Sequence, residues 1–323
     1  MDQHWSRRGF FGLTAAGLLT AGVSSACSRA EPDEDGQPVT IEHLFGETAI
    51  EAAPTRVVSA GFTGHDDLLA LGVVPIALTH WFGDEPFAVW PWAQAQLGDA
   101  EPVVLSLEDG IDVERIAELA PDLIVATNAG VDADTYDRLS QIAPTVPQTG
   151  PEAFFEPWRQ QARTIGRAVL AGQRMQTLID GIDAQFRGVP ERYPQFDGLS
   201  VLLLDGTLRG ADVLAVPAGW QTDFLTDMGF TVAASIAEFG TAGRAVIPRD
   251  RISEVLDAAD VLIWTTGNDD EIAALQADPE IAALAARQVF TTGEQAGAIA
   301  FASPLSYPLV ADQLPPLIAD GLR

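Results

Sequence analysis

The chain has 323 residues, of which 47% are hydrophobic, so it is long enough to form two domains with filled cores. All 18 basic residues are Arg, they face 46 Asp and Glu residues, and the formal net charge is −28. A charge of this sign repels nucleic acid and anionic lipid head groups, so we expect no nucleic-acid partner and interpret the acidity as a solvated surface.

The first 26 residues have the features of an export signal. Arg7 and Arg8 precede an apolar stretch at residues 10–23, and small residues then precede the only cysteine, Cys27. The apolar stretch is too short to form a stable membrane span, and the paired arginines indicate the export route that carries folded cargo. We therefore expect residues 1–26 to be a twin-arginine export signal that is removed.

Cys27 has two interpretations. In the first, its thiol is lipidated and becomes the mature N-terminus, although Ser24 stands where a lipid-attachment motif usually has Leu. In the second, an ordinary signal peptidase cuts after Ala26 and leaves a spare thiol. A lone cysteine has no disulfide partner, so its position at the cut favours lipidation. Residues 27–38 are then a lipid-anchored acidic tether, and loss of the leader, with its Asp and two Arg residues, lowers the net charge by one to −29.

Short apolar runs alternate with helical patterns in the segment that follows. The runs at residues 56–59 and 73–77 flank a helical stretch that ends at Gly72, a common position for a helix stop. Another helical stretch, residues 112–120, precedes the apolar run at 122–126. Continuous apolar runs of this length are typical of buried parallel strands, and their alternation with helices predicts an α/β architecture.

A longer helical pattern occupies the middle of the chain. Ile165, Val169 and Met175 recur at helical spacings, and no proline interrupts the pattern after Pro157. Strand-like runs then resume at residues 199–204, 261–264 and 288–291. The predicted fold is α/β, with an N-terminal lobe at 39–156 and a C-terminal lobe at 191–323. Both lobes have mainly parallel sheets flanked by helices, and one long backbone helix at 157–190 joins them.

Four stretches of this chain, in the same order and spacing, resemble the class III solute-binding proteins of ABC importers. They are residues 54–75, 112–124, 252–263 and 303–306, followed by a Leu-rich helix at the C-terminus. The family binds ferric siderophores, haem or cobalamin in a cleft between two lobes. The resemblance implies that this chain is a monomeric binding protein without a permanent cofactor. It also implies that the chain captures an Fe(III)-siderophore complex, or in the alternative haem or cobalamin.

The resemblance also implies how the protein meets its transporter. In the family, one acidic residue on each lobe docks onto the permease subunits of the ABC importer. Glu114 falls on the first of these positions, and Glu254 is the nearest match to the second. The alternative is that both are ordinary solvated helix residues. The protein is then expected on the outer face of the cytoplasmic membrane, attached through Cys27 only.

Candidate ligand-binding residues follow the strands, because ligands of open α/β sheets sit beyond the carboxyl ends of the strands. Aromatic side chains give broad contact area, and Arg side chains bind catecholate, hydroxamate or carboxylate oxygens. We expect an anionic ferric chelate bound by Arg209. Trp92 and Trp220 are expected near the cleft, where the preferred interpretation of Trp220 is that it caps a core. Each candidate also has a structural interpretation as a packing residue. The candidates are Phe62, Thr63, His80, Trp81, Trp90, Asn128, Arg209, Arg244, Trp264 and Tyr307.

Two other functions fit the sequence less well. A bare transition-metal site needs several His ligands, and only His43, His65 and His80 remain after the leader is removed, so we expect no metal site. An exported enzyme is the remote alternative. The sequence has no nucleophile elbow, phosphate loop or zinc-protease motif, and the acidic pair after His65 is expected to diverge on a helix. We therefore expect a binding protein and not an enzyme.

Overall fold

The structure of the chain is a computed structural model that describes residues 34–152, 154–241 and 243–323. The expected export signal, Cys27 and most of the expected tether lie outside the described residues. In the described part of the chain, no helix is both long and apolar enough to cross a membrane.

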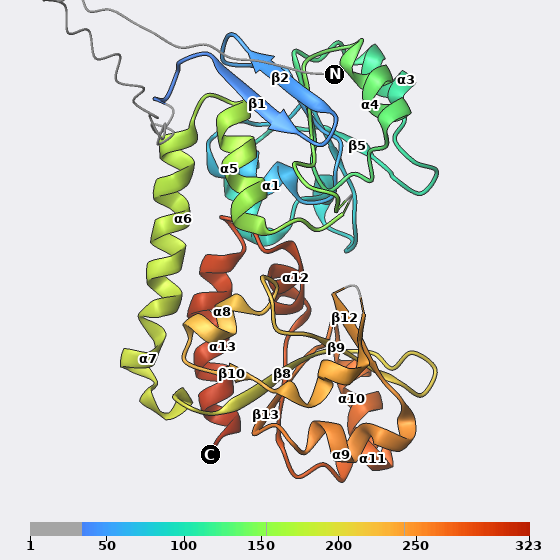
Figure 1. Cartoon of the computed structure of the whole chain (residues 1–323), viewed down its shortest axis with the longest axis vertical. Helices are drawn as coiled ribbons and strands as arrows, with labels where there is room; N and C mark the ends of the chain where they lie inside the picture. Colours follow the sequence, from blue (N-terminus) through green and yellow to red (C-terminus); the bar gives the residue numbers. More distant parts are fainter. Residues whose placement is uncertain (1–33, 153, 242) are drawn as a thin grey trace, which may run out of the picture. The chain divides into compact units, whose positions relative to one another are not determined.

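The N-terminal lobe, coloured blue to green in Figure 1, is built on a five-stranded parallel sheet, whose strand order is β5-β4-β3-β6-β7. A two-stranded antiparallel hairpin, β1-β2, precedes this sheet in the chain. The strands of the lobe are β1 (Val39–His43), β2 (Gly46–Ile50), β3 (Val57–Ser59), β4 (Ala77–Thr79), β5 (Val103–Leu105), β6 (Leu123–Ala126) and β7 (Thr145–Pro147). Its helices are α1 (Gly64–Ala70), the 3-10 helix η1 (Pro86–Ala88), α2 (Pro91–Leu97), α3 (Val113–Glu118) and α4 (Ala133–Ser140).

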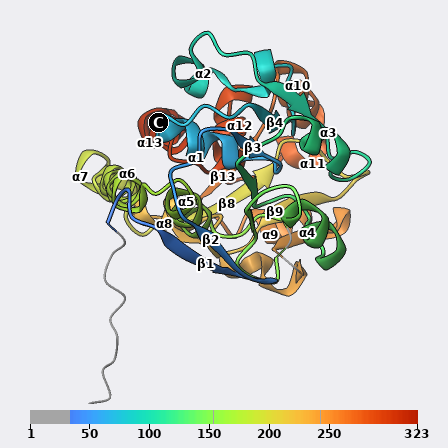
Figure 2. The same ribbon diagram turned by 90° about the horizontal axis from the view of Figure 1, so that it is seen from above.

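Alternate residues of the strands pack on opposite faces of this sheet. Val57 and Val125 face α1 and α5 (Trp158–Ala168), whereas Val58 and Ile124 belong to a separate apolar cluster with residues of α3 and α4. Figure 2 shows the two pairs of helices on opposite sides of the sheet. Helices therefore bury both faces, which explains the continuous apolar runs in the sequence.

The C-terminal lobe has a mixed sheet in the order β11-β12-β9-β8-β13-β14, and β10 also pairs with β8. The central strands β8, β13 and β14 are parallel, while β9, β12 and β11 extend the sheet as antiparallel neighbours. Its strands are β8 (Ser200–Asp205), β9 (Val213–Val216), β10 (Thr231–Val232), β11 (Gly240–Thr241), β12 (Arg244–Ile247), β13 (Val261–Thr265) and β14 (Arg287–Phe290). Its helices are η2 (Pro194–Phe196), α8 (Asp223–Asp227), η3 (Ala234–Phe239), η4 (Arg249–Arg251), α9 (Ile252–Leu256), α10 (Asp269–Ala277), α11 (Pro279–Ala282), α12 (Gly293–Phe301) and α13 (Tyr307–Gly321).

The segment expected as one helix at residues 157–190 instead forms three helices. They are α5, α6 (Gly172–Arg187) and α7 (Val189–Arg192). The chain turns back after α5 at Leu170, whose φ of 53° is incompatible with a continuing helix. Gly166 of α5 lies so close to α6 that an added Cβ would come within 2.6 Å of Met175 Cβ. The long helix between the lobes is α6, whose 16 residues span about 24 Å.

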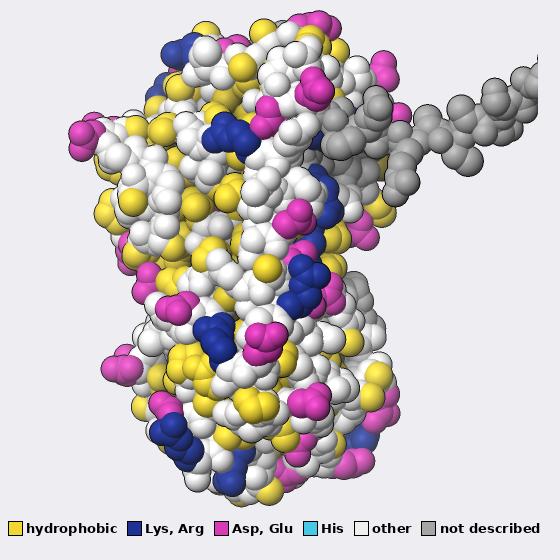
Figure 3. Space-filling view, turned by 90° about the vertical axis from the view of Figure 1, so that its left-hand side faces the viewer, with side chains coloured by type: hydrophobic (Ala, Val, Ile, Leu, Met, Phe, Trp, Pro, Cys, Tyr) yellow, Lys and Arg dark blue, Asp and Glu magenta, His cyan; other side chains and the backbone are white. Residues whose placement is uncertain are grey.

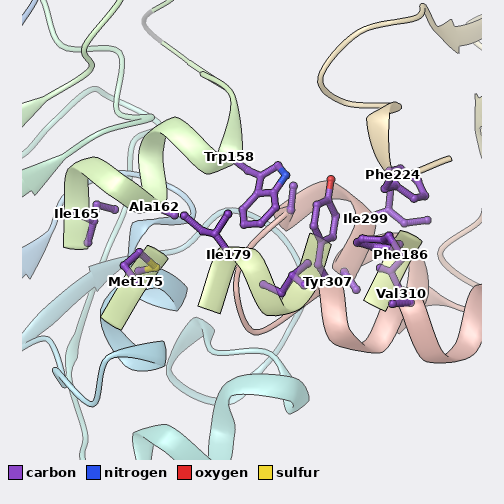
Figure 4. Close-up of a cluster of buried hydrophobic side chains, with 14 of the residues drawn as sticks. Trp158, Ala162, Ile165, Met175, Ile179, Phe186, Phe224, Ile299, Tyr307 and Val310 are labelled. Carbon is purple, nitrogen blue, oxygen red and sulfur yellow. The ribbon is translucent and has the colours of Figure 1, made fainter. Parts of the chain in front are cut away.

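One continuous apolar core passes from one lobe into the other. Side chains of α5, α6 and α13 meet in this core, as Figure 4 shows for Trp158, Ile179 and Tyr307. Tyr307 packs edge-on against Trp158 and Phe186, with ring centroids 5.2 and 5.4 Å apart. The same cluster reaches Val57 in the first lobe and much of the sheet of the second. Because such cores are close-packed, we infer that the lobes move little relative to each other.

Two aspartates play equivalent parts in the two lobes. Asp122 accepts hydrogen bonds from Thr55 N, Thr55 Oγ1 and Arg56 N just before β3. Asp260 accepts from Ser200 N and Ser200 Oγ at the start of β8. These bonds lower the pKa of both carboxyl groups. Each aspartate directly precedes a buried strand, β6 or β13. Its hydrogen bonds connect that strand to the neighbouring parallel strand, β3 or β8, at the amino ends of both.

A buried carboxyl group also links the two lobes. Ser303 Oγ, between α12 and α13, donates a 2.6 Å hydrogen bond to Asp66 Oδ2 on α1, and Trp92 Nε1 donates to the same oxygen at 2.8 Å. Asp66 Oδ1 has no hydrogen-bond partner, and the residue has no exposed surface. Burial raises the pKa of Asp66 to about 6, because the charged form loses its hydration.

We predict that the Asp66→Asn substitution changes how stability depends on pH. The raised pKa means that the folded state binds a proton more tightly than the unfolded state between about pH 6 and pH 4. The free energy of unfolding of the parent should therefore rise relative to the variant as the pH falls from 7 to 4, by about 2 kcal/mol. Urea unfolding at a series of pH values measures this difference.

The Asp122→Asn substitution is the control, because Asp122 has a lowered pKa. The stability that ionised Asp122 contributes is present above the pKa of this group in the unfolded state and is lost on acidification. As the pH falls, the parent should therefore lose stability relative to the Asp122→Asn variant. The same sign of pH dependence in both comparisons would contradict the assigned role of Asp66.

Candidate functional site

A cavity of about 240 Å³ lies between the two lobes. Trp81 and Phe155 contribute the wall from the N-terminal lobe. The remaining walls come from β8, β9, β13 and α12, and from the segments that precede α8 and β12. The lining residues are Trp81, Phe155, Leu203, Asp205, Leu214, Ala215, Val216, Trp220, Gln221, Gly243, Arg244, Thr265, Ala296, Ile299, Ala300 and Ala302.

Trp81 lies at the centre of an aromatic cluster that forms this wall. Its ring contacts Phe62, Phe82 and Phe155, with centroids 5.6, 4.6 and 5.1 Å away. It also lies 5.5 Å from the ring of Phe301, which comes from α12 of the other lobe. Stacked and tilted aromatic contacts of this kind favour particular ring orientations, so the rings of this wall support one another.

Asn128 holds Phe155 in place. Its Oδ1 accepts a 2.9 Å hydrogen bond from Phe155 N, and its Nδ2 donates to Thr63 Oγ1 at 3.1 Å. Gln161 Nε2 donates to the same hydroxyl and to Asp67 Oδ2. Asn128 and Phe155 have φ values of 54° and 60°, a conformation that Asn tolerates more readily than Phe. Thr63 and Asn128 were predicted to touch ligand, but both are buried and position the wall instead.

The polar lining groups are few. Arg244 is exposed, and within the described chain neither Arg244 nor Asp205 takes part in an ion pair. Asp205 Oδ1 accepts hydrogen bonds from Thr207 N and Thr207 Oγ1, each at 3.0 Å. Thr265 Oγ1 donates to Leu204 O, which leaves the side chain of Gln221 as the other neutral polar group. The site can therefore offer one guanidinium and one amide to a ligand, besides the indole N–H groups of Trp81 and Trp220, and the rest of its lining is apolar.

Trp264 and Tyr307, predicted as ligand-binding residues, lie in the core. Trp264 has no exposed surface, and its Nε1 donates to Gln288 Oε1 at 3.2 Å. Successive strand residues point to opposite faces of a sheet, so Thr265 faces the cavity while Trp264 points to the outer face. Tyr307 is 1% exposed within the shared core, and its burial raises the pKa of its hydroxyl.

Four other predicted residues are not among those that line the cavity. Arg209 is exposed at the turn between β8 and β9, where its backbone pairs with Asp212. His80 Nε2 lies 2.8 Å from Gly83 O, and Trp90 is stacked on Trp92 at 4.9 Å. Phe62 stacks on the ring of Trp81. Of the predicted set, Trp81 and Arg244 are the two that line the cavity.

Trp220, Gln221, Asp205 and Phe155 line the cavity although the sequence did not single them out as ligand contacts. Asp205 ends the strand-like run 199–204, so the rule that ligands lie beyond strand ends could have found it. Trp220 was expected to cap a core. No periodic pattern marks Trp220 or Phe155, because both lie in irregular segments.

The two predicted docking glutamates are exposed and similarly placed. Glu114 lies in the first turn of α3 and Glu254 in the first turn of α9, where an acidic side chain interacts favourably with the helix dipole. Glu114 Oε1 is 2.7 Å from Arg138 Nη2, and Glu254 Oε2 is 2.9 Å from Arg251 Nε. The helices α3 and α9 precede β6 and β13, which occupy equivalent positions in the two lobes.

The remaining charged side chains are of mixed sign. On the face shown in Figure 3, Arg side chains lie among acidic side chains and not in one basic patch. Among the residues the structure describes, no group of three His, Cys, Asp or Glu side chains is arranged to hold a metal ion. The enzyme alternative would need an accessible acid–base group at His65, Asp66 or Asp67. Each of these side chains is at most 1% exposed, so none is accessible to a substrate in this structure.

A family model for periplasmic binding proteins matches residues 57–296. This range includes most of both lobes and all lining residues of the cavity except Ile299, Ala300 and Ala302. This chain belongs to that family. A solved periplasmic solute-binding protein of Mycobacterium smegmatis is 60% identical, covers 89% of this chain and 99% of its own length, and superposes with a TM-score of 0.85. The predicted family and the two-lobed α/β fold are therefore confirmed.

More distant relatives carry more specific descriptions. The probable siderophore-binding lipoprotein YfiY of Bacillus subtilis is 32% identical over 174 residues, which are 51% of this chain and half of the length of YfiY. The iron-uptake binding protein PiaA of Streptococcus pneumoniae, solved with ferrichrome, is 23% identical. It covers 88% of this chain and 98% of its own length, with a TM-score of 0.71. At that identity, the likeness to PiaA is a likeness of fold.

Proposed function

We propose that the protein captures a ferric siderophore in the cavity between its lobes and delivers it to an ABC importer. It acts as an extracytoplasmic binding protein and catalyses no reaction. The siderophore complex is its cargo, and it holds no permanent cofactor.

The observation that carries the proposal is a cavity lined both by an aromatic wall and by an Arg that forms no ion pair within the described residues. Trp81 and Phe155 offer a flat apolar surface, and Arg244 offers a guanidinium fork that matches the oxygens around a chelated metal. The shared core restricts movement of the lobes, so binding costs little reorganisation. The description of YfiY as siderophore-binding supports the same ligand class.

We predict that purified protein binds a ferric siderophore with nanomolar to micromolar affinity and that Trp81→Ala weakens this binding at least about tenfold. The substitution removes the central ring of the wall and loosens Phe155. Titration of intrinsic Trp fluorescence against ferric siderophores, haem and cobalamin measures the affinities, because ferric chelates quench nearby indoles.

Arg209→Gln is the matched control, since Arg209 is an exposed Arg outside the cavity, and its affinity should equal that of the parent. A thermal melt of each variant separates lost binding from lost folding. Binding of cobalamin or haem, with no binding of any ferric siderophore, would contradict the proposed ligand.

We further propose that Glu114 and Glu254 dock onto the permease. Both project from the first turn of an exposed helix, one on each lobe, and their Arg partners are surface residues whose pairing contributes little stability. Arg groups of a permease can therefore replace these partners without a large energetic cost.

We predict that Glu114→Arg blocks uptake of the ferric chelate by cells while its affinity in solution stays within about threefold of the parent. Glu118→Arg is the control, because Glu118 lies on the same helix and is equally solvated. Uptake of iron-55 chelate by cells that express each variant gives the comparison. Normal uptake by Glu114→Arg would rule out the docking role.

We also propose that lipidated Cys27 anchors the exported protein to the outer face of the cytoplasmic membrane. The twin-arginine leader ends at this lone cysteine, and the acidic residues that follow would keep the body away from the head groups. Cys27→Ala should move the protein from the membrane fraction to the soluble fraction, whereas Ser28→Ala should not. Membrane retention of Cys27→Ala, measured by immunoblot after fractionation, would eliminate the anchor.

A further inference from the structure

The charges on the described walls of the cavity nearly cancel. Of the 16 lining residues, only Asp205 and Arg244 carry a formal charge, one of each sign. The other polar side chains, Gln221 and Thr265, are neutral. The remaining walls are aliphatic or aromatic, apart from Gly243.

This arrangement is unfavourable for a highly charged ligand. An ion that leaves water for an apolar wall loses hydration, and the loss must be offset by charges or hydrogen bonds of the site. A single guanidinium is available, and Asp205 repels any anion that Arg244 attracts. The whole chain adds no compensation, because its net charge is −28. At physiological salt that background is screened beyond about 8 Å, so the local pair decides the selectivity.

The iron ligands of siderophores differ in charge. Three hydroxamates, each singly negative, cancel the charge of Fe(III), whereas three catecholates, each doubly negative, leave a trianion. The neutral complex presents carbonyl and hydroxamate oxygens that accept hydrogen bonds from one guanidinium and one amide. The trianion needs several cations, and the described walls supply one.

We propose that the cavity selects ferric chelates of zero or nearly zero net charge, of the trihydroxamate type, and that Asp205, which lines the same sheet wall as Arg244, excludes tris-catecholates. This inference rests on the proposed function. Asp205 Oδ1 is occupied by Thr207, and Oδ2 has no hydrogen bond within the described residues, so its charge is not neutralised locally. Arg244 then orients the neutral complex by hydrogen bonding and not by attraction of net charge. The anionic chelate expected from the sequence is thereby replaced by a neutral one.

The test compares two probes of known charge on the purified protein. Ferrichrome, an uncharged ferric trihydroxamate, should bind at least about 100-fold more tightly than ferric enterobactin, a tris-catecholate trianion. Raising the salt concentration from about 0.05 to 0.5 M should leave ferrichrome affinity unchanged. The residual affinity for ferric enterobactin should rise, because salt screens the repulsion by the acidic body.

Two substitutions identify the responsible residues. Asp205→Asn keeps the shape of the side chain and removes its charge, so the ratio of ferric enterobactin affinity to ferrichrome affinity should rise about tenfold. Asp212→Asn is the matched control, because Asp212 lies near the same hairpin but does not line the cavity. It should change neither affinity.

Each result decides between the alternatives. Equal or tighter binding of ferric enterobactin would overturn the charge selection and leave the proposed capture of ferric siderophores intact. An unchanged preference in Asp205→Asn would overturn the role of that carboxylate. Binding of neither ferric chelate, by protein whose thermal melt is normal, would overturn both this inference and the proposed function.

Discussion

The apolar core shared by the two lobes is the constraint on which the binding site depends. Helices α5, α6 and α13 pack through Trp158, Ile179 and Tyr307, and the same cluster continues into both sheets. A cavity that lies between two domains keeps its shape only if the domains keep their separation. Here close-packed side chains set that separation, so the aromatic wall of one lobe stays at a fixed distance from Arg244 of the other.

A buried hydrogen bond also connects the two lobes, in addition to the apolar packing. The hydrogen bond from Ser303 to Asp66 crosses the lobe boundary in a fully buried setting, where an unpaired carboxylate oxygen is costly. Close by, an added Cβ at Gly297 of α12 would come within 2.8 Å of the Trp90 ring. Both contacts place α12 against the N-terminal lobe, and α12 also supplies one wall of the cavity. The groups that join the lobes therefore also shape the site.

The acidity of the whole chain and the balanced charge of its cavity have different physical effects. Acidic side chains exposed to solvent favour solubility, and salt screens their field within a short distance. Under the proposed function, the rings and aliphatic walls of the cavity supply the contact with the ligand, and one guanidinium adds hydrogen bonds. A chelate that has little charge loses little hydration on entry and gains the full benefit of that contact.

The sequence by itself determined the fold class, the family and the strands β3, β6, β8, β13 and β14, whereas the run expected at residues 73–77 lies mostly before β4. Apolar runs of strand length, helix stops and the Asp122 and Asp260 motifs depend on neighbouring residues, so they can be read locally. The sequence also indicated Trp81 and Arg244. The tertiary structure alone decided that Thr265 and not Trp264 faces the cavity, because a shift of one residue along a strand reverses the face. It alone broke the middle helix at Leu170 and brought Phe155 to the wall through Asn128, since both depend on contacts between segments far apart in the chain.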